Sequence, residues 1–174
     1  MTAQIAERLH YDGEEHALCG CPLEHYFAMG GHRPDFQRTS TGLWRRYVGE
    51  WEVLGGRLYL IGLEGELEDG TAVSVATLFP GFSDRVFAHW CTYTLRVPQG
   101  QMLEYAHMGF DSTYERDLLI EVERGVVTSA RVQVNGVADD VDEDTSEGYF
   151  VGRRTKQMCH RRRWGPFLVA HIPR

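Results

Sequence analysis

The chain of 174 residues is long enough for one domain with a sizeable core, and 43% hydrophobic with 25% charged residues is typical of a soluble globular protein. It has no apolar run of the roughly 20 residues that cross a bilayer, and its first 15 residues carry acids and lack the apolar stretch of a secretory signal, so we expect a cytoplasmic protein without a membrane partner. Four Cys are too few for a disulfide scaffold and are expected as reduced thiols.

The net charge of −7 is unevenly spread along the chain. Residues 153–174 hold seven Arg or Lys and no acid, which leaves 11 basic and 25 acidic residues, a balance of −14, on residues 1–152. We therefore expect one β-rich domain over 1–152 and a basic C-terminal tail over 153–174. Because the tail also carries several large apolar side chains, we favour its docking on the domain; a nucleic-acid arm is the alternative.

Near the N-terminus, "HYDGEEHAL" predicts two short strands joined by a turn at Asp12-Gly13. The next segment, "CPLEHYFAMGG", predicts a short helix over residues 22–29. Pro22 suits the first turn of a helix, and Gly30-Gly31 would end it.

From residue 43 onward the pattern becomes β. Gly55-Gly56 predicts a hairpin turn, and the strand after it is apolar on both faces, which predicts a central position in the sheet. Further strand-like runs are "TAVSVATLF", "RVFAHWCTYTLRV" and, after a turn at Pro98–Gly100, "QMLEYAHMG". About seven or more short strands and one short N-terminal helix predict a mainly β fold, an antiparallel sandwich or barrel.

The stretch "VVTSARVQV" over residues 126–134 alternates in polarity. Its more apolar face is expected to point at the core. That face consists of Val126, Thr128, Ala130, Val132 and Val134.

Two groups of residues have the composition of metal sites. Asp140, Asp142 and Asp144 alternate as in a calcium loop, but Gly is absent from the sixth position and Glu from the twelfth, so we interpret them as a solvated acidic loop, with a weak calcium site as the alternative. A zinc site could use four residues, although their spacing is unlike that of known zinc motifs; they are Cys19, Cys21, Cys159 and His160. We expect no metal and no cofactor.

Residues 97–115, "VPQGQMLEYAHMGFDSTYE", are dense in polar side chains. On a strand over 101–109, Glu104 would share a face with two Met and an Ala, so we expect it to pair with Arg96 across the turn. The alternative is catalysis with Glu104 as base and His107 as its proton partner, although a regular strand places them on opposite faces. Tyr114 and Glu115 complete the candidate catalytic set.

A second cluster lies upstream, where Arg and aromatic side chains of the kind that favour ligand sites are concentrated. Trp51 and Trp90 are expected in the core. The predicted ligand-binding residues are Arg45, Tyr47, Arg96, Tyr105 and His107.

Several segments, among them "WRRYVGEWEVLGGRLYLIGLEG", "VFAHW" and "LRVPQGQMLEYAHMGF", resemble in order and spacing a family of small, uncharacterised bacterial and phage-encoded proteins with a W-R-G-Y segment and an R-x-P-x-G-x-x-L-x-Y-x-H-M-G-Y segment. The resemblance spans about residues 20–127 and implies a domain that occurs alone in bacteria and phages, without implying an activity. Arg46 and Tyr93 stand where that pattern prefers Gly, and Phe110 where it has Tyr. Loss of the glycines would alter a place of close backbone or ligand approach.

Taken together, these features predict a non-catalytic binding protein of an accessory, immunity or anti-defence type. Its partner would be a protein or a small nucleotide-like ligand held on the aromatic and Arg-bearing surface, and it could form oligomers. The alternatives are a small hydrolase or transferase that uses Glu104 and His107, and nucleic-acid binding through residues 153–174.

Overall fold

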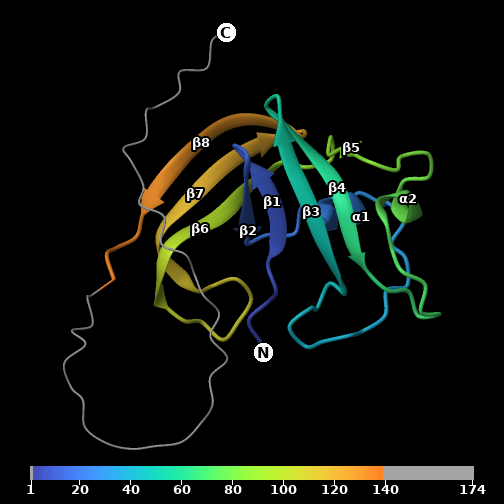
Figure 1. Cartoon of the computed structure of the whole chain (residues 1–174), viewed down its shortest axis with the longest axis horizontal. Helices are drawn as coiled ribbons and strands as arrows, with labels where there is room; N and C mark the ends of the chain where they lie inside the picture. Colours follow the sequence, from blue (N-terminus) through green and yellow to red (C-terminus); the bar gives the residue numbers. More distant parts are fainter. Residues whose placement is uncertain (1, 139–174) are drawn as a thin grey trace, which may run out of the picture. The chain divides into compact units, whose positions relative to one another are not determined.

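The structure, a computed structural model, describes residues 2–138 and is mainly β (Figure 1). Its elements are β1 Glu7–Tyr11, β2 Glu14–Leu18, α1 Pro22–Ala28, β3 Tyr47–Leu54, β4 Arg57–Gly65, α2 Val75–Leu78, β5 Val86–Phe87, β6 Tyr93–Glu104, β7 Thr113–Glu123 and β8 Val126–Val134. Within the described residues, no helix is long and apolar enough to cross a membrane. The expected end of the domain at residue 152 and the basic tail lie outside the described residues.

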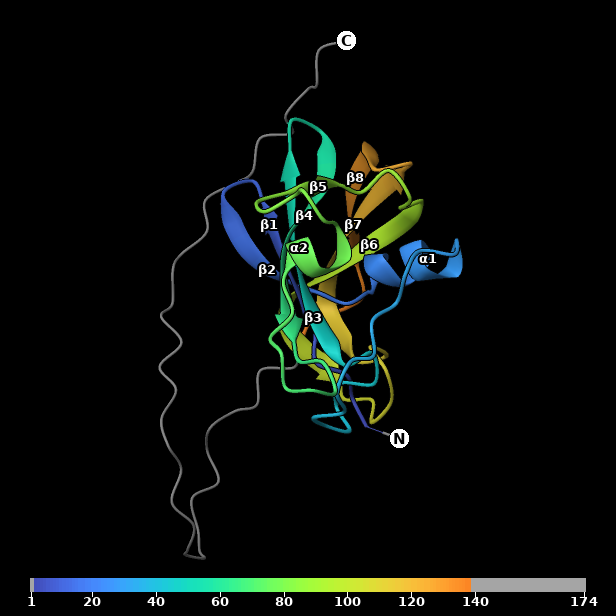
Figure 2. The same cartoon turned by 90° about the vertical axis from the view of Figure 1, so that its right-hand side faces the viewer.

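The strands form one sheet in the order β2-β1-β3-β4-β8-β7-β6, with β5 paired to β4. The sheet is not closed, and it is mixed because β1 pairs with β3 in parallel whereas the other pairings are antiparallel. β6, β7 and β8 run side by side as one curved group, and β1, β3 and β4 as another (Figures 1 and 2). The expected mainly β, sandwich-like fold with a short N-terminal helix is thereby confirmed.

Both predicted hairpin turns are present. Asp12 and Gly13 have φ of 53° and 80°, and Gly55 and Gly56 have φ of 58° and 72°, which are the left-handed pairs that two-residue hairpins require. The predicted helix begins at Pro22 and ends one residue earlier than expected. β4 is central, as predicted, because it pairs with β3, β5 and β8.

Two predictions of strands were wrong in detail. Residues 75–78 form the short helix α2, which begins after Ser74 with a reciprocal side-chain and backbone pairing between Ser74 and Thr77. The chain does not turn at Pro98–Gly100 either. β6 runs through this segment and absorbs it as an irregularity in its pairing with β7, where Gly100 has φ of 82°.

The predicted core-facing side of β8 was wrong at the start of the strand, for Val126 and Thr128. A bulge next to Thr128 shifts the alternation, so that Val127, and not Val126, packs against the core. Beyond the bulge, Val132 and Val134 do lie opposite Leu118 and Arg116 of β7 but are 53% and 70% exposed.

Candidate functional site

Arg45, which lies in the turn before β3, is the buried cation of this fold, with 6% of its surface exposed. Its Nε lies 2.9 Å from Oε1 of Glu7, and its Nη2 donates a hydrogen bond of 2.9 Å to the carbonyl oxygen of Ile5. Its Nη1 makes no hydrogen bond to any of residues 2–138. The two N–H groups of Nη1 are therefore available to water or to an acceptor in the hollow beside it, since Nη1 is not among the fully buried polar atoms that have no partner.

Glu7, at the start of β1, is the buried counter-ion of Arg45. Its Oε2 accepts a hydrogen bond of 2.5 Å from Nε1 of Trp51. Gly49 makes room for this carboxylate, since a Cβ there would lie 2.7 Å from the same oxygen. Burial raises the pKa of Glu7 from 4.5 to about 7, although the Arg45 charge and the Trp51 hydrogen bond oppose the rise.

Arg45 lines an open hollow of about 370 Å³, which we call the Arg45 pocket. Its walls come from the N-terminal stretch, α1, the turn before β3 and the loop over residues 105–112. The guanidinium carbon of Arg45 lies 5.7 Å from the ring centre of Tyr47 and 6.0 Å from that of Phe110. The lining residues are Gln4, Cys21, Glu24, Arg33, Trp44, Arg45, Gly109 and Phe110.

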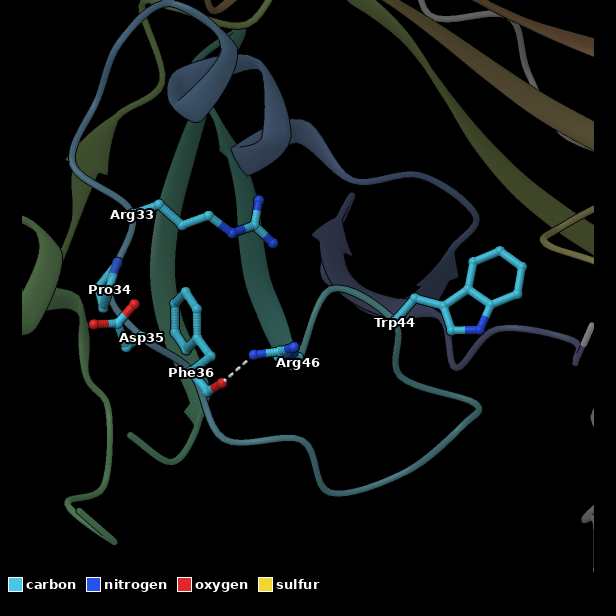
Figure 3. A pocket seen from close by; sticks show the side chains of 6 residues that line it. All are labelled: Arg33, Pro34, Asp35, Phe36, Trp44 and Arg46. Carbon is cyan, nitrogen blue, oxygen red and sulfur yellow. Dashed lines mark hydrogen bonds between the residues drawn. The ribbon is translucent and has the colours of Figure 1, made fainter. Parts of the chain in front are cut away.

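A second hollow of about 350 Å³, the Arg46 pocket, shares Arg33 and Trp44 with the first (Figure 3). Figure 3 shows the Arg33 side chain extending between Phe36 and α1, and Arg46 donating a hydrogen bond of 2.9 Å to the carbonyl oxygen of Phe36. Trp44 is 47% exposed. The Arg46 pocket is lined by Arg33, Pro34, Asp35, Phe36, Trp44 and Arg46.

Glu24 of α1 connects Arg33, which lines both hollows, to the buried Tyr47. Its Oε1 accepts a hydrogen bond of 2.9 Å from the Tyr47 hydroxyl, and its Oε2 lies 2.7 Å from Nη1 of Arg33. The Arg33 guanidinium also lies 4.8 Å from the ring centre of Phe27. Burial raises the pKa of Tyr47 far above its usual range, so Tyr47 stays protonated and donates to Glu24.

At Arg46, one of the two positions where the sequence resemblance leads us to expect Gly, the backbone has a conformation that Gly adopts more readily than other residues. Arg46 has φ of 70°, in the left-handed region that costs L-residues roughly 1–2 kcal/mol. Tyr93, at the other departure, lies with its ring 5.2 Å from that of His25 and 3.1 Å from where a Cβ of Gly20 would be. The first departure thus places strain at the pocket, and the second fills space beside α1.

Because of that φ, Arg46→Gly should be more stable than Arg46→Ala by about 1 kcal/mol, since both lose the Phe36 hydrogen bond and only Ala keeps the strained backbone. Denaturant midpoints of the two variants measure the difference. At Arg57, in regular β4, the order should reverse, with Ala the more stable. The same order at both positions would contradict the explanation.

Of the predicted ligand residues, Arg45 and Tyr47 come together, and Tyr47 is fully buried. Arg96 lies apart from the pocket but hydrogen-bonds the carbonyl oxygens of Phe110 and Ser112, at 2.7 and 2.8 Å, and so holds the loop that supplies Phe110.

Tyr105 and His107 contact each other on the exposed surface, with 3.0 Å between the hydroxyl and Nδ1. Neither residue lines either pocket.

The expected pair of Arg96 with Glu104 was wrong. Nε of Arg96 lies 2.9 Å from Oδ1 of the buried Asp117, whereas Glu104 is exposed and has no ion pair among residues 2–138. The cause is that β6 continues through Pro98, which places Asp117, and not Glu104, beside Arg96.

The other candidate catalytic residues do not gather at a pocket. Glu104 is opposite Thr113 at the end of β6. Glu115 accepts hydrogen bonds of 3.1 Å from the backbone N–H groups of Gln101 and Ala138, and these lower its pKa. The backbone carbonyl of Tyr114 accepts a hydrogen bond from Asn135, and neither Tyr114 nor Glu115 lines either hollow.

The thiols beside the pocket are held in the protonated form. Burial raises the pKa of Cys21 to about 12 and also raises that of Cys19. Among residues 2–138 there is no cluster of three or more His, Cys, Asp or Glu that could hold a metal ion. Cys159, His160 and the acidic loop at 140–144 lie outside the described residues.

Sequence reasoning missed Glu7, Glu24 and Arg33. A signal for Glu7 existed, because it shares one face of a short strand with Leu9, an unusual place for a carboxylate without a partner. Comparisons of the chain with family models, curated proteins and solved structures found no match.

Proposed function

We propose that this protein is a non-catalytic binding protein, and that its ligand is a small organic anion with a planar ring, of the nucleotide-like kind. The observation that carries the proposal is Arg45, a buried guanidinium that lines an open hollow and keeps Nη1 without a partner among residues 2–138. Carboxylate and phosphate oxygens are the acceptors that a guanidinium binds best.

The aromatic residues that line the two hollows favour a ligand with a planar ring. Trp44 is half exposed and lines both hollows, and Phe110 also lines the Arg45 pocket. Rings of this kind bind a flat ligand through stacking, while an adjacent cation fixes its orientation.

Charge at the site also favours an anion. Arg33, Arg45 and Arg46 contribute three positive charges, while Glu24 and Asp35 contribute two negative ones. Glu7 lies beneath Arg45, and with a pKa of about 7 it is half protonated near neutral pH. The surroundings of Arg45 are therefore balanced or slightly positive, in a chain of net charge −7.

Binding is favoured over catalysis by the state of the groups around the pocket. Cys21 and Tyr47 are held protonated, and Glu24 is engaged by Arg33 and Tyr47. Glu7 has a pKa suitable for a general base, but it is fully buried beneath Arg45 and out of reach of a ligand in the hollow.

The proposal is tested with adenosine 5′-monophosphate and benzoate as probes, followed by two-dimensional amide NMR. We expect shifts at Trp44, Arg45, Gly109 and Phe110 with either probe. Trp44→Ala, at an exposed position, should weaken binding about 10-fold, the order of one stacking contact.

Phe82→Ala provides the matched control, because Phe82 is an aromatic residue of similar exposure that lies outside both hollows. Shifts confined to other surfaces, or no shift with millimolar concentrations of either probe, would contradict the proposed function.

A further inference from the structure

β8 has one open edge. It pairs with β7 from Val126 to Val134, but with β4 only where Val126 meets Arg57. From residue 128 to 134 its other edge has no strand partner among residues 2–138. We call this segment the open β8 edge. Unpaired strand edges present backbone donors and acceptors to any chain that can add a strand.

The open β8 edge lacks the features that usually protect such edges. Residues 128–134 read "TSARVQV", with no Pro, no acid and the single charge of Arg131. The strands at the two ends of the sheet, β2 and β6, differ from β8. β2 is five residues long and begins with Glu14 and Glu15, and β6 receives a backbone hydrogen bond at Arg96 from Cys19.

An apolar surface accompanies the open edge. Val132 and Val134 lie on the face that continues the core side of β7, yet they are 53% and 70% exposed. Alternation along the strand places Arg131 and Gln133 on the opposite face. A partner strand must therefore bring apolar side chains to one face and accept a cation on the other.

We propose that the open β8 edge pairs antiparallel with the same strand of a second copy of this chain. The register that we assign is centred on Val132, which lies opposite its own copy in the partner. Ala130 of each chain then lies opposite Val134, on the apolar face, and Arg131 opposite Gln133, on the polar face.

Charge selects this register over its neighbour. Centring the pair on Arg131 would place two guanidinium groups directly opposite each other, which is unfavourable. Centring it on Val132 separates the cations and opposes each Arg131 with an amide that can accept its hydrogen bond. The strand thus matches itself in polarity on each face and keeps its two cations apart, as a twofold interface requires.

Analytical ultracentrifugation of the full chain, from 5 to 200 µM, tests the proposal. We expect a dimer. Val132→Asp, which places two carboxylates together on the axis, should raise the dissociation constant at least 100-fold. Phe82→Asp is the matched control, because Phe82 is also 53% exposed and lies far along the chain from β8, and it should leave the constant unchanged. Circular dichroism checks that each variant remains folded.

Gln133 tests the register itself. Gln133→Glu should tighten the dimer roughly 3- to 10-fold, since each Arg131 would then face a carboxylate across the axis, and Gln133→Arg should weaken it. A monomeric full chain at 200 µM would overturn the proposal, as would a dimer that Val132→Asp leaves intact. A dimer that Gln133→Glu fails to strengthen would overturn the assigned register.

Discussion

Replacement of Arg45 by Met should destabilise the protein by about 3–5 kcal/mol at pH 8, because it leaves the carboxylate of Glu7 buried without its cation. The loss should be smaller at pH 5. There Glu7 already carries a proton, since its pKa is about 7 in the folded protein, and a neutral carboxyl needs no counter-ion. Thermal and urea unfolding at both pH values measures the difference.

In the unaltered protein, the carboxyl of Glu7 should make the free energy of unfolding decrease as the pH rises. Its pKa rises from 4.5 in the unfolded chain to about 7 on folding, so the folded state binds more protons between these values. The contribution of Glu7 to stability is thus greatest below pH 4.5 and falls by about 3 kcal/mol as the pH rises to 7. Glu7→Gln should remove this part of the pH dependence.

Two further variants test whether the loss in Arg45→Met comes from the ion pair between Arg45 and Glu7. Adding Glu7→Gln to Arg45→Met should recover much of the loss at pH 8, because an amide oxygen can still accept the Trp51 hydrogen bond. Arg85→Met breaks an exposed pair with Glu52 and should cost about 1 kcal/mol or less. An equal loss for Arg45→Met at pH 5 and pH 8 would show that Arg45 does not balance the charge of Glu7.

Local patterns of the sequence predicted the local structure well. The left-handed hairpin pairs Asp12-Gly13 and Gly55-Gly56 and the N-terminal proline of α1 act over two or three residues, and the structure contains all of them. The central position of β4 followed from its two apolar faces, of which the face of Leu58 and Leu60 is buried and the face of Tyr59 and Ile61 is half-buried.

Errors arose where one residue changes the register of a strand. The bulge at Thr128 exchanged the roles of Val126 and Val127, and alternation in the sequence cannot show which strand carries the extra residue. A second error arose at Gly100, at the start of the 97–115 stretch. The triplet Pro-Gln-Gly has the composition of a turn and was predicted as one, but in the structure it lies within β6 as an irregularity in the pairing.

The site could be predicted only in part, because its residues come from distant segments. Arg45 and Tyr47 were identified as residues poorly explained by packing alone, and they lie together, with Arg45 lining the pocket and Tyr47 buried behind it. Their partners Glu7 and Glu24 lie 38 and 23 positions away, respectively, from Arg45 and Tyr47, and only the parallel pairing of β1 with β3 and the position of α1 bring them close.

Arg96 is expected to be the most important side chain of the 97–115 stretch. Arg96→Met removes the ion pair with Asp117 and the hydrogen bonds to the carbonyls of Phe110 and Ser112. Asp117 is 5% exposed and would keep only Asn135 as a side-chain partner, so we expect a loss of about 3 kcal/mol in unfolding free energy. Glu104→Gln, at an exposed position, should change it by less than about 0.5 kcal/mol.

The loop should respond more strongly than the fold. In Arg96→Met the segment over residues 105–112 loses two of the hydrogen bonds that hold it in place, and with them part of what keeps Phe110 near Arg45. Amide exchange of Ala106 and Asp111, whose N–H groups are hydrogen-bonded within this loop, should accelerate at least 10-fold in Arg96→Met and stay unchanged in Glu104→Gln. Arg96→Lys should fall between them, because an ammonium group cannot bridge Asp117 and both carbonyls with the planar geometry of a guanidinium. If Glu104→Gln proved the more damaging change, Arg96 would not be the residue that secures this wall of the Arg45 pocket.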